Sequence, residues 1–255
     1  AVALAHLCRE SDLNAVFIQY DGLAVLMNMI CSTIAAVQKE GARALHALAK
    51  KACHSFEDTT PPPPTPQVYL GEQYVNSKTL SDVSFVVEGK TFHAHRIALL
   101  ASSDAFRAMF DGGYKEKEAQ DVEIPNISWK VFESMMRFIY TGTVEVENDV
   151  AQELLRAADQ YLLEGLKKIC EHTIAKGLAT DNVVDLFELA DAFHAPNLQH
   201  ACILYALEHH QDMVTELGVM AFYEIMKRMR DTTLAYFEKI VTSPVADGSK
   251  IVSQK

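Results

Sequence analysis

Histidine and cysteine groups are the residues of this sequence whose types could bind a metal or supply a nucleophile. They are His93-Ala94-His95, Cys170-Glu171-His172, Cys53-His54, and His200-Ala201-Cys202 with His209-His210. None has the CxxC or HExxH spacing of a zinc site. Cys170 and Cys202 lie on apolar helical stripes, where a buried thiol is unreactive, and Gly112-Gly113 lacks the Lys-Ser or Lys-Thr of a phosphate loop. The sequence therefore predicts no metal site, no cofactor, no catalytic residue and no enzyme.

Charge and composition narrow the class of protein and its partners. The 255 residues carry a net charge of −11 and are 49% hydrophobic, enough for one large domain or several small ones. None of the large segments is basic, which argues against direct contact with nucleic acid. The five cysteines are odd in number and widely spaced, which favours a reducing compartment. The chain shows no signal peptide and no uncharged run of membrane length, so we expect a nuclear or cytoplasmic protein without membrane contact. The missing initiator Met indicates a fragment.

Residues 81–110 predict a β-hairpin that leads into two short apolar helices. Val83, Phe85 and Val87 alternate with Ser84 and Val86, and Gly89 stands where a tight turn needs a positive φ. A hairpin alone is marginally stable, so the helices after it must cover it. Ser102, Ser103 and Asp104 are alternative caps for the second helix.

The residues of this stretch resemble a known family. The run FHAHRIALLASSDAFRAMF from Phe92 to Phe110, together with Leu80-Ser81-Asp82-Val83 and Phe138-Ile139-Tyr140-Thr141-Gly142, resembles the BTB (POZ) domain. The resemblance covers residues 68–178 and implies an α+β fold. It also implies dimerisation and, for many members, recruitment of a cullin scaffold to make a ubiquitin ligase.

The rest of this segment predicts a strand and helices. Asp121-Val122-Glu123-Ile124-Pro125 is typical of a short strand stopped by proline. Ser128 is the expected cap of a helix that ends at Gly142. Two more amphipathic helices are predicted between Leu154 and Gly177. Residues 179–241 are helical throughout and resemble the BACK region that often follows a BTB domain, and residues 242–255 are expected to form a flexible tail.

Residues 1–56 hold only helical patterns. Ala3-Leu4-Ala5-His6-Leu7-Cys8 and Ala44-Leu45-His46-Ala47-Leu48-Ala49 echo each other 41 residues apart, a period found in helical solenoids. This all-α region resembles the C-terminal end of an armadillo array. Residues 57–67, with five prolines between Pro61 and Pro66, predict a semi-rigid linker. An SH3 or WW ligand is the other interpretation, but it lacks a flanking basic residue.

The resemblance implies a dimer interface that includes Leu70, Tyr74, Asp82 and Arg96. In the family pattern, an acidic residue before the first strand and a basic residue after the second meet near the dimer axis, and Asp82 and Arg96 hold these positions. Two solvated surface ions are the alternative. Leu70 and Tyr74, spaced i, i+4, are expected on one face of a short helix before the hairpin. Such an apolar face is typical of a symmetric interface.

The resemblance also implies a cullin-binding site. Cullin-binding members carry a hydrophobic-x-Glu motif in the loop after the second short helix, and Tyr114-Lys115-Glu116 fits it. Phe110 precedes this loop, and Tyr161 is a lesser candidate on the same family surface. A large ring can enter a partner pocket while a carboxylate fixes the register. An ordinary charged loop is the alternative.

The combined pattern resembles armadillo/BTB proteins of the plant type. The function that it implies is a substrate adaptor of a cullin-RING ubiquitin ligase. The BTB homodimer would bind the cullin, and the armadillo repeats would recruit a protein client, with transcription factors as one candidate class. A dimeric scaffold or transcriptional co-regulator that binds no cullin is the alternative.

Overall fold

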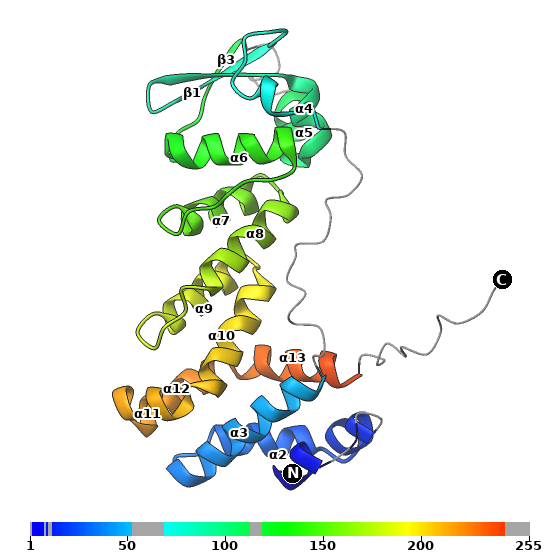
Figure 1. The fold of residues 1–255 in the computed structure, drawn as a ribbon, viewed down its shortest axis with the longest axis vertical. Coiled ribbons are helices and arrows are strands. Elements are labelled where there is room, and N and C mark those ends of the chain that lie inside the picture. Colours follow the sequence, from blue (N-terminus) through cyan, green and yellow to red (C-terminus); the bar gives the residue numbers. More distant parts are fainter. Residues whose placement is uncertain (1, 8, 10–11, 53–68, 113–118, 243–255) are drawn as a thin grey trace, which may run out of the picture. The chain divides into compact units, whose positions relative to one another are not determined.

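The computed structural model describes residues 2–7, 9, 12–52, 69–112 and 119–242 (Figure 1). The predicted linker (57–67) lies outside the described residues, as does the predicted tail beyond residue 242. Contacts divide the chain into two units, which are described separately. Unit 1 takes its residues from Ala1–Asp58, Leu178–Phe187 and Gln199–Lys255, and unit 2 from Thr59–Gly177 and Glu188–Leu198.

A small sheet forms one layer of unit 2. Its strands are β1 (Val83–Val87), β2 (Lys90–Ala94) and β3 (Asp121–Glu123), in the order β2-β1-β3. β1 and β2 form the predicted antiparallel hairpin, with Phe85 opposite Phe92, and β3 runs parallel to β1. Gly89 has a φ of 74°, which confirms the prediction of a positive φ in the turn.

Helices cover this sheet and build the aromatic core of unit 2. They are α4 (Arg96–Ser102), α5 (Asp104–Asp111), α6 (Trp129–Thr141), α7 (Ala151–Gln160) and α8 (Glu164–Ala175). In Figure 1, α6 lies directly under the strands, and α7 and α8 follow it. The Phe85 ring centre lies 5.9 Å from that of Phe106 and 5.3 Å from that of Phe132. The alternating residues of β1 therefore face the helices, as their sequence pattern predicts.

The caps of two helices show one correct prediction and one wrong one. Ser103 caps α5, because its Oγ accepts a hydrogen bond from the Phe106 N–H at 3.2 Å. Ser128 occupies the cap position of α6 without making the cap hydrogen bond. Instead the Glu88 carboxylate, at the hairpin turn, accepts from the Trp129 N–H at 2.9 Å. A residue distant in sequence therefore satisfies the first donor of α6.

All the regular secondary structure among the described residues of unit 1 is helical. Unit 1 contains α1 (Val2–Leu7), the π-helix η2 (Ala15–Gln19), α2 (Gly22–Ile30), α3 (Ala35–Ala52), α11 (His210–Leu217), α12 (Val219–Arg228) and α13 (Arg230–Thr242). Two further helices, α9 (Val183–Ala192) and α10 (Pro196–Glu208), contribute residues to both units. Helices α9 to α13 occupy the stretch 179–241, for which the sequence predicts helices throughout.

The C-terminal helices pack on the N-terminal ones within unit 1. α13 contacts η2, α2 and α3, and α11 contacts α3. The sequence suggests a repeat region and a separate BACK-like region, whereas the contacts group most of both into one unit. The predicted boundaries at 56 and 178 and the BACK assignment stay predictions.

Candidate functional site

His95 contacts three segments of the chain close to the residues predicted at the dimer interface. Its ring is buried, and its backbone N–H donates to the Tyr140 hydroxyl at 2.9 Å. Its Nδ1 lies 2.8 Å from the same hydroxyl, and its Nε2 donates to the Thr79 carbonyl oxygen at 2.8 Å. Burial raises the pKa of Tyr140 to about 12. Tyr74 places its ring edge-on against His95, with centres 5.7 Å apart.

The segment before the hairpin differs from the predicted helix. Only Glu72–Tyr74 is helical, as the 3₁₀ helix η3, so Leu70 and Tyr74 do not share an i, i+4 face. The reason is Gly71, whose φ of 95° breaks the helix path. The Gly71 N–H donates to the Tyr140 carbonyl oxygen at 2.9 Å, and Glu72 pairs with Arg137 on α6. The segment is therefore held by its own chain, with Leu70 and Tyr74 only partly exposed.

Asp82 and Arg96 do meet, but through a backbone group of the same chain. The Asp82 carboxylate accepts from the Arg96 N–H at 2.7 Å and thereby caps α4. The Arg96 guanidinium donates from Nη2 to the Ala119 carbonyl oxygen at 2.7 Å and lies 4.4 Å from the centre of the Phe110 ring. Arg96, predicted at the dimer interface, therefore contacts Phe110, predicted at the cullin site.

Phe110 and Tyr161 are core residues in this structure. Their exposed fractions are 3% and 4%. The Tyr161 ring stacks on Phe106 at 4.7 Å, the Ser103 hydroxyl donates to the Tyr161 carbonyl oxygen at 2.6 Å, and burial raises the pKa of Tyr161 to about 12. Neither ring is accessible as placed, and a direct contact of Phe110 or Tyr161 with a partner stays a prediction. Tyr114, Lys115 and Glu116 lie outside the described residues.

Two exposed apolar side chains near His95 were missed by sequence reasoning. Leu80 is 83% exposed and Ile97 is 69% exposed. Each lies close in sequence to a residue of the hydrogen-bonded group, since Leu80 follows Thr79 and Ile97 follows Arg96. Leu80 also has a φ of 59°, which is uncommon for a residue other than glycine. Ile97 lies in the first of the two helices expected to cover the hairpin, and no sequence signal marked its side chain as exposed.

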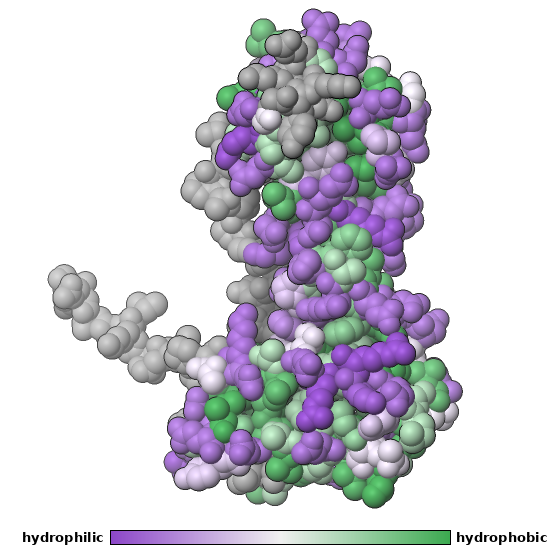
Figure 2. Space-filling view, turned by 180° about the vertical axis from the view of Figure 1, so that it is seen from behind, coloured by the Kyte–Doolittle hydropathy of each residue, from purple (hydrophilic) through white to green (hydrophobic). Residues whose placement is uncertain are grey.

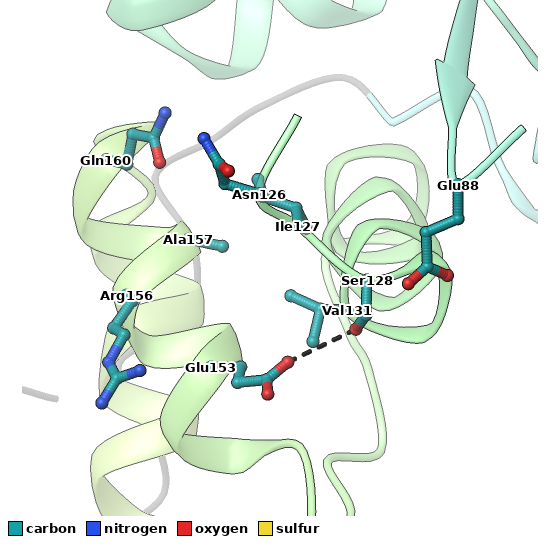
Figure 3. Close-up of a pocket in the computed structure, with 9 residues that line it drawn as sticks. All are labelled: Glu88, Asn126, Ile127, Ser128, Val131, Glu153, Arg156, Ala157 and Gln160. Atoms are coloured by element: carbon teal, nitrogen blue, oxygen red, sulfur yellow. Dashed lines mark hydrogen bonds between the residues drawn. The ribbon is translucent and has the colours of Figure 1, made fainter. Parts of the chain in front are cut away.

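A polar pocket of about 400 Å³ lies beside the hairpin turn, at the start of α6 and along α7 (Figure 3). Glu153 of α7 points toward Ser128, whose hydroxyl donates to it at 3.4 Å. Glu88 lies on the opposite wall and is engaged by the Trp129 N–H. These groups fasten the hairpin and α7 to α6. No histidine or cysteine is among the residues that line the pocket.

The two cysteines on apolar helical stripes, Cys170 and Cys202, are fully buried. Burial raises the pKa of the Cys170 and Cys202 thiols to about 12, so the reactive thiolate is disfavoured. Within the described ranges, no cluster of three or more His, Cys, Asp and Glu side chains could hold a metal ion. Among the described helices, none combines the length and apolar character needed to cross a bilayer. Figure 2 shows polar side chains interleaved with apolar ones over the face it displays.

Comparison with known proteins identifies the class to which unit 2 belongs. Residues 72–178 match the BTB/POZ domain family. The sheet, the covering helices and the match agree with the α+β fold expected from the sequence. The chain therefore carries a BTB/POZ domain.

Similar proteins also include armadillo-repeat members. The chain is 59% identical over 210 residues to the Arabidopsis thaliana "ARM repeat protein interacting with ABF2", covering 82% of this chain and 30% of that protein. It is 49% identical over 247 residues to the Arabidopsis thaliana "Armadillo BTB Arabidopsis protein 1", covering 96% of this chain and 33% of that protein. The chain thus spans about a third of the length of these relatives. The solved BTB domain of zebrafish PATZ1 is 31% identical, with 38% of this chain and 76% of that chain covered and a TM-score of 0.34.

Proposed function

We propose that this chain belongs to a substrate adaptor of a cullin-RING ubiquitin ligase that acts in the nucleus or cytoplasm and has no catalytic activity of its own. The BTB/POZ domain and the armadillo-repeat BTB relatives support a role in protein interaction. In the proposal, the BTB domain dimerises and binds the cullin, and armadillo repeats recruit a protein client. The name of one relative refers to an interaction with ABF2, which is in keeping with a client protein, for example a transcription factor.

The observation that supports the cullin site most directly is the position of Arg96. Its guanidinium rests over Phe110 at the end of α5 and donates to the carbonyl of Ala119. Phe110 and Ala119 lie on either side of the segment that contains Tyr114 and Glu116 in the sequence. A cullin would therefore meet a segment whose two ends are already fixed, which lowers the entropy cost of binding.

The residues of the proposed cullin site then divide by role. Tyr114 supplies the apolar anchor and Glu116 the carboxylate that sets the register, with Lys115 between them. Phe110 and Tyr161 support the site from the core, since both are buried beside Phe106.

We propose that the dimer uses the surface around His95. Leu80 and Ile97 present exposed apolar area there, and Leu70 and Tyr74 add partly exposed area. Asp82 and Arg96 contribute by fixing α4. A dimer would present two cullin sites and two client sites, which raises the avidity for a bivalent client.

Titration calorimetry of the whole chain with a purified cullin amino-terminal domain tests the proposal. We expect micromolar or tighter binding, and Tyr114→Ala should weaken it by about 2 kcal/mol or more. Glu116→Ala should also weaken it, whereas Lys78→Ala, an exposed lysine elsewhere in unit 2, should have no effect. Light scattering of each variant checks that the dimer persists.

The alternative is a dimeric scaffold or co-regulator that binds no cullin. It is favoured if the wild-type protein is dimeric by light scattering and gives no binding heat at micromolar concentration. A wild-type monomer would exclude both forms of the proposal.

A further inference from the structure

Helix α13 contacts all three elements that end the N-terminal helical region of unit 1. These elements are η2, α2 and α3, and Figure 1 shows α13 beside the last two. In a helical solenoid, each repeat is covered by the next one, and the final repeat needs a different cover. A helix that packs on η2, α2 and α3 together takes the place of a further repeat.

The two faces of α13 differ as a terminal helix requires. Phe237 is fully buried and Val241, four residues further on, is 5% exposed. Asp231, Glu238 and Thr242 are exposed and lie on the other side of the helix, given its period of about 3.6 residues. The last element of a solenoid needs such a polar outer face to stay soluble, because an apolar face would bind another molecule.

Hydrogen bonds fix the position of the C-terminal helices on α2 and α3. Arg230, at the start of α13, donates from Nη2 to Asn28 Oδ1 at 3.3 Å, in the last turn of α2. A cation is favourable there, because the C-terminal end of a helix is negative. The Gln38 amide of α3 donates to the Val219 carbonyl oxygen at 3.4 Å, and its oxygen accepts from His210 Nε2 at 3.2 Å. These directional bonds select one register of α11, α12 and α13.

We propose that α11, α12 and α13 form the cap of a helical array that ends with η2, α2 and α3, and that the BTB/POZ domain is inserted between the array and this cap. Residues 59–177 of unit 2 lie, in sequence, between the two larger segments of unit 1. The cap covers the face on which a second copy of this chain would otherwise stack, so it prevents end-to-end association. This role depends neither on a cullin nor on a client.

Light scattering of the whole chain over a range of concentrations tests the proposal. The variant Phe237→Asp, Val241→Asp places two carboxylates on the buried face of α13 and should release the cap, because an unpaired buried charge is unfavourable. We expect its average mass to reach at least twice that of wild type as the concentration rises. The variant Ala235→Asp, Thr242→Asp adds the same charge on the exposed face and should keep the wild-type mass at every concentration.

Hydrogen exchange of both variants locates the change. Release of the cap should speed exchange in α12 and α13, while β1 of unit 2 keeps its protection. If the first variant also leaves α2 and α3 unprotected, Phe237→Ala replaces it, because truncation adds no charge. A released cap with the wild-type mass at all concentrations would overturn the proposal, as would an equal rise in mass in the inner-face and outer-face variants. Because each variant is compared with wild type, the result does not depend on whether the BTB/POZ domain dimerises.

A cut in the predicted linker provides a second test. A protease recognition sequence is inserted within residues 57–67 of the whole chain, and the cut protein is analysed by size-exclusion chromatography. The N-terminal fragment should elute with the rest of the wild-type chain, because the cap holds α2 and α3. It should elute apart from the rest in the variant Phe237→Asp, Val241→Asp. Separate elution of the two wild-type fragments would overturn the proposal, and intact cullin binding would then leave the adaptor function in place.

Discussion

The two units differ in the partners of their buried polar side chains. In unit 2, the Tyr140 hydroxyl accepts from the His95 N–H, and the buried Glu171 carboxylate accepts from the Leu198 N–H at 2.9 Å. In unit 1, several polar groups near the core are imidazole rings. The His200 ring is tilted by 34° against that of Tyr236, with centres 4.3 Å apart, and His210 lies edge-on to Phe222 at 4.7 Å. His46 Nδ1 is buried without a hydrogen-bond partner.

Because of this difference, a fall in pH should change the stability of the two units in opposite directions, through the buried histidines of unit 1 and through Glu171 of unit 2. Burial lowers the pKa of His200 to about 4 and also lowers that of His210 and His46, because the charged ring loses its hydration. Burial raises the pKa of Glu171, against the hydrogen bonds that it accepts at the start of α10. As pH falls, the histidines of unit 1 therefore lower its stability, because the unfolded chain binds their protons more readily than the folded chain does. Glu171 acts in the opposite sense, because its carboxylate is protonated more readily in the folded state.

The largest effect is expected from removing aromatic volume from unit 2. Phe85 is fully buried among Phe106, Phe110 and Phe132. Phe85→Ala should lower the free energy of unfolding of unit 2 by about 3–5 kcal/mol. Hydrogen exchange should show faster exchange in β1 and α6. In the matched variant Phe222→Ala in α12, amide exchange should become faster in α3 and α13 instead. If either variant speeds exchange equally in both units, the two units do not unfold separately.

Acid should weaken unit 1 next most strongly. The pKa of His200 is about 4 in the folded chain and about 6.5 in an unfolded one. Between these values the unfolded chain binds a proton that the folded site excludes, so stability falls as pH decreases. The loss between pH 7 and pH 5 is at most on the order of 2 kcal/mol, because the ring is partly exposed to solvent. Urea unfolding at pH 7 and pH 5, followed in α13, measures this loss. His200→Phe keeps a ring beside Tyr236 and should flatten the pH dependence; an unchanged slope would contradict the assignment.

A moderate effect is expected where α3 meets the C-terminal helices of unit 1. Gln38→Ala removes the acceptor of His210 and the donor to Ser32, and leaves buried polar groups without partners. The expected destabilisation is about 1–3 kcal/mol. Exchange of α3 and α11 amides should increase while β1 stays protected. A double-mutant cycle with His210→Phe would give no coupling energy if the two side chains did not interact.

The smallest effect tests the hairpin turn of unit 2. At Gly89 an added Cβ would meet no atom, but the φ of 74° disfavours any other residue. Gly89→Val should therefore destabilise by about 1 kcal/mol or more through backbone strain alone. Gly177→Ala, where the added Cβ would make only ordinary contact, is the control and should leave the melting midpoint nearly unchanged.

Much of the BTB/POZ domain could be predicted from the sequence because its signals are local. Alternation in Val83–Val87 and the turn at Gly89 specify the hairpin, Ser103 caps the helix that it precedes, and Gly142 ends α6 with a φ of 75°. The candidate sites were less predictable. Phe110 and Tyr161 are large apolar rings in helical segments, but a local pattern does not show whether such a ring is exposed for a partner or packed on Phe106.

The sequence by itself determined most of the elements of this protein, their order and the family of its central domain, because propensity, periodicity and turn chemistry depend on near neighbours. The tertiary structure alone decided which distant surfaces meet. It placed α11 and α13 on α3, set Glu88 as the cap of α6 and directed Arg96 to Phe110 and Ala119. The physical reason is that an apolar or charged face is encoded locally, whereas the partner that covers it is selected by packing across the whole fold.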